Sequence, residues 1–147
     1  MANIAVSGWG LTVLRVVIGI VFLAHGVEKF FISGVGGVTG FFTQLGIPLP
    51  GLSAFVVSFF ELVAGAALII GFYTRLAAIP LAIISLVAML TVHVGNGFFN
   101  QQGGVEYTLT LLAACVALVL SGAGEAALKR TAVPTREAGG DTVSVGD

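Results

Sequence analysis

Charged residues are scarce in this chain, and their scarcity decides the broad class of the protein. Aspartate, glutamate, lysine and arginine together make up 9% of the 147 residues, whereas hydrophobic residues make up 57%. A typical soluble domain has about a quarter of its residues charged. The composition therefore predicts one integral membrane domain in contact with the lipid bilayer. A net charge of −1 without a basic patch argues against a nucleic-acid partner.

Cysteine is almost absent as well. The chain has one, Cys115, and it lies inside an apolar run. One cysteine excludes an internal disulfide and a CxxC redox pair, so small membrane enzymes that work by thiol–disulfide exchange are poor models. We interpret Cys115 as a small packing residue.

Four apolar segments are long enough to approach the roughly 20 residues that cross a hydrocarbon core. They cover residues 9–30, 52–72, 74–93 and 105–122. The first lacks a basic n-region and contains Arg15, so it is not a cleavable signal peptide. The stretch "GFYTR" makes segments two and three a tight hairpin. The sequence thus predicts an all-α fold, a four-transmembrane-helix antiparallel bundle.

The two longer connections are rich in glycine and are expected on the same, outer side. They read "SGVGGVTGFFTQLGIPLPG" and "GNGFFNQQGG", and each holds a Phe-Phe pair suited to the interface. The opposite side carries most of the basic residues, which makes both termini cytoplasmic. These basic residues are Arg75, Lys129, Arg130 and Arg136.

We therefore expect a multi-pass protein of a bacterial or archaeal plasma membrane. Residues 1–124 form the predicted transmembrane domain. Residues 125–147 are polar and lack apolar periodicity, which predicts a mobile cytoplasmic tail.

Small and polar residues recur along single helix faces, where they allow close helix packing. In the first segment the face consists of Arg15, Gly19, Phe22 and Gly26. In the third it consists of Ala78, Ala82, Leu86, Met89 and His93. In the fourth it consists of Glu106, Thr110, Ala113, Ala117, Ser121 and Gly124.

Two ionisable residues fall deep inside the predicted bilayer. Glu61 lies near the middle of the second segment, and Arg15 lies roughly 8 Å in from the cytoplasmic end of the first. An unpaired charge at the bilayer centre costs roughly 2.5–3.5 kcal/mol, which favours a buried ion pair between them. The pair could fix helix register, or Glu61 could belong to a proton path.

A second polar layer lies near the outer face. His25, His93 and Glu106 come from three different segments and reach about the same depth. Glu28 and Lys29 follow His25 by three and four residues, so they lie over the same side of the helix. We predict that these five residues share a pocket beneath the outer loops, with Glu28 and Lys29 at its rim.

Three chemistries fit such a pocket. Two imidazoles and a carboxylate could ligate a transition metal, but they have no local ligand spacing, so we predict no metal site. The groups could bind and protonate a quinone headgroup. They could also bond only to one another and anchor the loops. The sequence assigns no catalytic residue.

Several spaced motifs carry a family resemblance, including "LRVVIGIVFLAHGVEKF", "FFELVAGAALIIGFYTRLAAIPLAIISLVAMLTVH" and "GVEYTLTLLAACVALVLSGAG". Residues 11–124 resemble the DoxX family of small four-helix membrane proteins, with Glu125 departing from the usual ending. The family is related to the small membrane subunit of a thiosulfate:quinone oxidoreductase, so the resemblance implies a quinone-linked redox role. The carrying residues are Arg15, Gly19, His25, Gly26, Lys29, Glu61, Gly65, Gly71, Arg75, His93, Glu106, Gly122 and Gly124.

Two functions remain open at this point. The chain could be a redox accessory subunit that binds quinone, without a covalently bound cofactor, and that works with a partner protein. It could instead be a non-catalytic scaffold or small-molecule permeation subunit. In both cases we expect a homo-oligomer or a subunit of a membrane complex.

Overall fold

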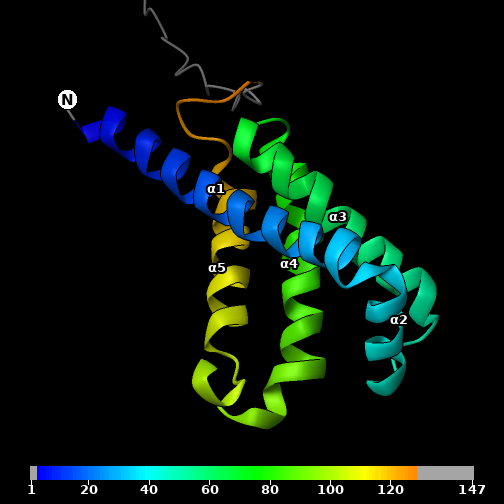
Figure 1. Cartoon of the computed structure of the whole chain (residues 1–147). Coiled ribbons are helices and arrows are strands. Elements are labelled where there is room, and N and C mark those ends of the chain that lie inside the picture. The colour runs from blue at the N-terminus through cyan, green and yellow to red at the C-terminus, as the bar shows by residue number, and fades with distance from the viewer. Residues whose placement is uncertain (1–2, 129–147) are drawn as a thin grey trace, which may run out of the picture.

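The protein is helical throughout the part of the chain that the structure, a computed structural model, describes, residues 3–128. This part has five α-helices, with π-helical or 3₁₀ turns between α1 and α2 and between α4 and α5, and no strand (Figure 1). The predicted all-α class is confirmed. The α-helices are α1 (Asn3–Val27), α2 (Gly34–Gln44), α3 (Pro50–Ile70), α4 (Thr74–Ala88) and α5 (Glu106–Ser121). The turns are η1 (Glu28–Ile32), η2 (Met89–His93), η3 (Val94–Asn96) and η4 (Asn100–Gln102).

Three helical stretches are long and apolar enough to cross a membrane. They are Gly8–Ile32, Pro50–Ile70 and Thr74–Asn96, close to the first three predicted spans. The fourth apolar helix, α5, has 16 residues and a length of about 24 Å. It is therefore shorter than the roughly 30 Å of a hydrocarbon core.

The helices form two pairs that cross each other. α1 packs along α3, and α4 packs along α5, as Figure 1 shows. An apolar core of buried side chains from all four helices lies between the pairs. These side chains include Ile18, Phe22, Leu68, Leu81, Cys115 and Leu118. Cys115 is a packing residue of this core, as its apolar surroundings in the sequence predict.

Glycines allow the backbones of α1 and α3 to touch. A Cβ built on Gly65 would lie 2.5 Å from the Leu23 nitrogen and 3.0 Å from the Gly19 oxygen. A Cβ on Gly26 would overlap the backbone of Leu62. The small-residue face predicted for the first segment is thus confirmed as a packing face.

The face predicted for the fourth segment is wrong. Thr110 and Ala113 are exposed, and the buried residues of α5 are instead Thr108, Leu111, Cys115 and Leu118. α5 therefore packs on its neighbours through this stripe and not through the predicted one. The stripe predicted for the third segment is also wrong at Leu86, which is exposed.

The first of the two glycine-rich connections contains a helix where the sequence predicted a loop. α2 begins at Gly34 and packs beside α3 (Figure 1). Its threonine hydroxyls bond one turn back, Thr39 to the Val35 carbonyl at 2.7 Å and Thr43 to the Thr39 carbonyl at 2.8 Å. Their polar groups are therefore satisfied within the helix, and its phenylalanines are left for packing and for the interface.

The chain beyond α5 folds back over α1 and α3. The Glu125 and Ala126 amides donate to Thr12 Oγ1 at 3.0 and 3.3 Å, and the Leu128 amide donates to the Ile70 carbonyl at 3.1 Å. The first four residues of the predicted mobile tail are therefore part of the packed structure. The rest of that predicted tail, residues 129–147, lies outside the described residues.

Candidate functional site

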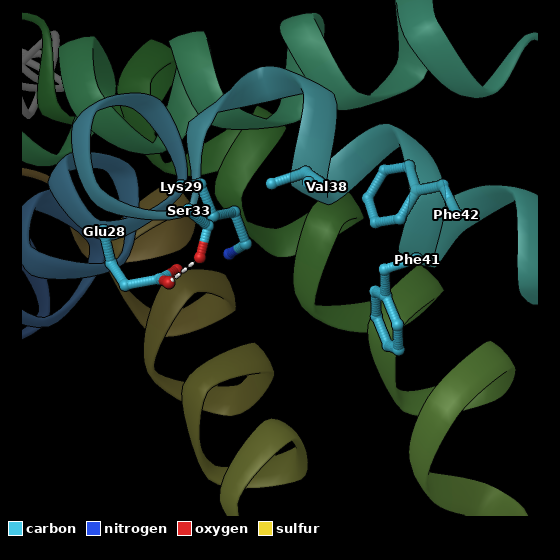
Figure 2. Close-up of a pocket in the computed structure, with 7 residues that line it drawn as sticks. Glu28, Lys29, Ser33, Val38, Phe41 and Phe42 are labelled. Atoms are coloured by element: carbon cyan, nitrogen blue, oxygen red, sulfur yellow. Dashed lines mark hydrogen bonds between the residues drawn. The ribbon is translucent and has the colours of Figure 1, made fainter.

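A cavity of about 430 Å³ lies between η1 and α2, at the end of the molecule opposite the N-terminus. One wall is polar, and the wall formed by α2 is largely apolar, with two phenylalanine rings (Figure 2). A cavity of this volume falls within the usual range of about 300–1,000 Å³ for small-molecule sites. Its lining residues are Glu28, Lys29, Ser33, Gly37, Val38, Phe41 and Phe42.

Lys29 connects the cavity to the buried centre of the bundle. Its Nζ donates to Glu61 Oε2 at 2.6 Å, and the two side chains are 22% and 5% exposed. The lysine lies in the π-helical turn η1, which adds a residue to the helix turn and shifts the side chains that follow. We infer that this shift lets Lys29 both reach Glu61 and line the cavity.

Glu28 and Ser33 form the outer rim of the cavity. The Ser33 hydroxyl donates to Glu28 Oε1, a bond marked in Figure 2, and the Ser33 amide donates to the Glu28 carbonyl at 2.9 Å. The two residues are therefore tied together across η1. Glu28 is exposed, so it presents a carboxylate to water beside the Lys29 ammonium.

His25 contacts a residue that the sequence did not single out. Its Nε2 lies 3.4 Å from the Tyr107 hydroxyl, and the ring centroids are 6.3 Å apart. This distance is long for a hydrogen bond, so the contact is weak. Tyr107 follows Glu106 directly and is one of two tyrosines in the chain, a signal that could have drawn attention to it.

His93 and Glu106 hold the connection between α4 and α5. His93 Nδ1 donates to the Gly103 carbonyl over 2.6 Å, and Glu106 Oε1 accepts from the Asn100 amide over 2.7 Å. Backbone groups in a loop need hydrogen-bond partners from protein wherever water does not reach them. These two side chains satisfy part of that need.

The single pocket predicted from sequence is therefore corrected. The cavity keeps Glu28 and Lys29, but His25, His93 and Glu106 are not among its lining residues. Equal depth did not bring the three together, since His93 and Glu106 turn toward the loop of their own helix pair. Within residues 3–128, no three His, Cys, Asp or Glu side chains gather closely enough to hold a metal ion.

The prediction of an ion pair between Arg15 and Glu61 is wrong, because the partner of Glu61 is Lys29. Glu61 lies level with Gly26, since a Cβ on Gly26 would be 2.9 Å from the Glu61 carbonyl carbon. Arg15 precedes Gly26 by eleven residues, or about 16 Å along α1. The contacts of Gly26 and Gly65 set this antiparallel register, so Glu61 meets Lys29 instead.

Arg15 lies at the other end of the bundle and is only 1% exposed. Its Nη2 donates to the carbonyl of Ala126, in the segment that follows α5. Its Nη1 packs so closely on Gly71 that a Cβ there would overlap it. Nε and Nη1 have no hydrogen-bond partner among the described residues.

The amino-acid sequence of this chain is similar to a family of known proteins. A family model described as DoxX matches residues 10–94. "Putative oxidoreductase CatD" of Bacillus subtilis is 34% identical over 113 residues, which cover 77% of this chain and 79% of that protein. An uncharacterized membrane protein of Mycobacterium tuberculosis is 31% identical over 127 residues, covering 80% and 77%. "Inner membrane protein YphA" of Escherichia coli is 28% identical over 94 residues, covering 63% of each chain. No solved structure matches.

Proposed function

Because this chain belongs to the DoxX family of membrane proteins, we propose that it is a quinone-binding accessory subunit of a membrane oxidoreductase. The cavity between η1 and α2 is the proposed headgroup site. In this proposal, electrons come from a partner oxidoreductase. The name of the Bacillus relative is consistent with a redox role.

The observation that carries the proposal is the pairing of a charged donor with an aromatic wall in one cavity. Lys29 Nζ has three N–H donors, of which one serves Glu61, so the others can reach a quinone carbonyl. Phe41 and Phe42 offer apolar surface to the ring. The Lys29 ammonium can protonate a reduced oxygen and is then reprotonated from water at the exposed rim of the cavity, and the Glu61 carboxylate stabilises the restored ammonium.

Access from the membrane suits a lipid-soluble ligand. Phe31 and Ile32, in the same turn as Lys29, are strongly exposed, and Phe41 is exposed on the neighbouring helix. Apolar side chains at this position can lie in the acyl region of a bilayer. A quinone could therefore enter sideways, with its tail left in lipid.

A cavity-filling substitution tests this site. We expect Gly37→Leu to weaken binding of a short-chain quinone analogue about tenfold or more, because the added side chain projects into the cavity. Gly36→Leu is the matched control, since Gly36 is on the same helix, does not line the cavity and has open space around it. Fluorescence-quenching titration in detergent measures both affinities. Equal binding by the two variants, or none by the unmodified protein, would contradict the site.

We also propose that α5 completes a four-span bundle with both termini in the cytoplasm. The α3–α4 turn, the N-terminal end and the segment after α5 lie at one end of the molecule (Figure 1). Arg75 is at that end, and the sequence has further basic residues after Leu128, in agreement with the positive-inside rule. A relative's name places that protein in an inner membrane.

Cysteine labelling checks the topology. In a Cys115→Ala background, we expect a membrane-impermeant thiol reagent to label Gly95→Cys in intact cells but Thr142→Cys only after lysis. Gly95 is exposed and has open space around it, so the substitution is compatible with the fold. Labelling of position 142 from outside intact cells would reverse the proposed orientation.

The structure also favours a second candidate, a non-catalytic scaffold or permeation subunit of a complex. His93 and Glu106 are hydrogen-bonded to loop backbone, which is a structural use of residues that the sequence offered as candidates for a quinone site. Purification in mild detergent, followed by mass spectrometry of extracted lipids and proteins, separates the two. Bound quinone or an associated oxidoreductase supports the first function, whereas a homo-oligomer with neither supports the second.

A further inference from the structure

Arg15 is a buried positive charge for which the described residues provide no counter-ion. A guanidinium stays protonated in proteins. Among the described residues, Lys29 and Glu61 form the salt bridge, and Arg15 has a carbonyl oxygen as its hydrogen-bond partner. A buried charge of this kind is normally paired, so its missing partner points to an ion or ligand.

Other unpaired donors lie at the same end. Thr74 is 2% exposed, and its hydroxyl has no partner in residues 3–128; the same is true of Arg75 Nε. Thr74 also begins α4, so the backbone N–H groups of its first turn have no acceptor within the helix. No backbone carbonyl of the described residues accepts from the N–H groups of Thr74, Arg75 or Leu76.

Two glycines bring these donors together. Gly71 packs against Arg15 Nη1 and stands three residues before Thr74, across a tight turn. Gly122, at the end of α5, lies beside Arg75, with its Cβ position 3.3 Å from Nε. Two guanidinium groups, a hydroxyl and the positive end of a 15-residue helix therefore surround one end of the bundle.

We propose that this end binds a phosphate-type oxyanion, either the headgroup of an anionic phospholipid or a free phosphate. Tetrahedral oxyanions accept several hydrogen bonds at once, and helix N-termini and arginines are their usual partners. Basic pockets between membrane helices on the cytoplasmic side commonly hold lipid headgroups. The site lies at the opposite end from the cavity and does not depend on the proposed quinone function.

The segment after α5 covers the proposed site in this structure. The Ala126 carbonyl accepts a hydrogen bond from Arg15 Nη2, and Ala127 lies against Gly71. The unpaired Arg15 atoms are shielded from solvent. Binding of the oxyanion therefore replaces the Ala126 carbonyl and requires this segment to shift.

Thermal unfolding of the full chain in lipid nanodiscs tests the proposal. We compare phosphatidylcholine discs, the same discs with inorganic phosphate, and discs containing phosphatidylglycerol, with chloride matching the ionic strength. At a ligand concentration about a hundredfold above Kd, we expect Tm to rise by about 5–10 °C. A response only to phosphatidylglycerol identifies the lipid source, and a response to inorganic phosphate identifies the free ion.

Variants separate a bound oxyanion from a general charge effect. Arg75→Gln and Thr74→Val should each raise the half-saturating concentration about tenfold. Arg136→Gln also removes one positive charge, but from residues outside the described part of the chain. It should leave the half-saturating concentration unchanged. The proposal fails if Tm responds to neither source, or if the response survives both Arg75→Gln and Thr74→Val. Arg15→Met, if it folds, should also lose the response.

Discussion

Replacing Lys29 with methionine should lower the free energy of unfolding by roughly 3–5 kcal/mol, because it leaves the Glu61 carboxylate buried without its partner. Glu61→Leu should cost less, roughly 1–2 kcal/mol, because the partly exposed Lys29 ammonium can turn toward water. The double variant Lys29→Met/Glu61→Leu should recover most of the loss, since apolar replacements of a buried pair are often neutral. Equilibrium unfolding in mixed micelles measures all three.

Arg15 provides the control for this double-mutant cycle. Arg15→Met combined with Glu61→Leu should give additive losses, because the two side chains lie at different levels of α1 and α3. Strong coupling between Arg15 and Glu61 would contradict the register described above. Additive losses from Lys29→Met and Glu61→Leu would show that their ion pair contributes nothing to stability.

Adding one methyl group at the crossing of α1 and α3 is the second large effect that we expect. Gly65→Ala should destabilise the protein by roughly 3 kcal/mol, because the new Cβ would meet the Leu23 nitrogen and the Gly19 oxygen. Both are backbone atoms and cannot turn aside as a flexible side chain could. Relief requires α1 and α3 to move apart, which also weakens the contact at Gly26.

Gly10→Ala is the matched control, since a Cβ at Gly10 meets nothing within 4 Å. Both substitutions replace a helical glycine, so both gain the same helix propensity, roughly 0.5–1 kcal/mol. Gly10→Ala should therefore be neutral or stabilising in the same unfolding measurement. If Gly65→Ala behaved in the same way, close backbone packing would not hold α1 to α3.

The sequence alone determined the features that depend on composition and on local order. Scarce charge and long apolar runs led to a helical membrane protein, and the spaced motifs led to the DoxX family. The face of Arg15, Gly19, Phe22 and Gly26 was also predictable, because residues three and four apart share one side of a helix whatever it packs against. Glu28 and Lys29 both line the cavity, as two neighbours in the chain can.

Only the tertiary structure decided which groups meet across helices. Counting residues along each helix estimates depth only if the helices are parallel. The backbone contacts at Gly26 and Gly65 fix a particular register and bring Lys29, not Arg15, to Glu61. The π-helical turn and α2 then form a cavity that no spacing in the sequence marks. His93 and Glu106 turned to loop carbonyls and amides, because backbone groups without water must find partners, and that need is visible only once the chain is folded.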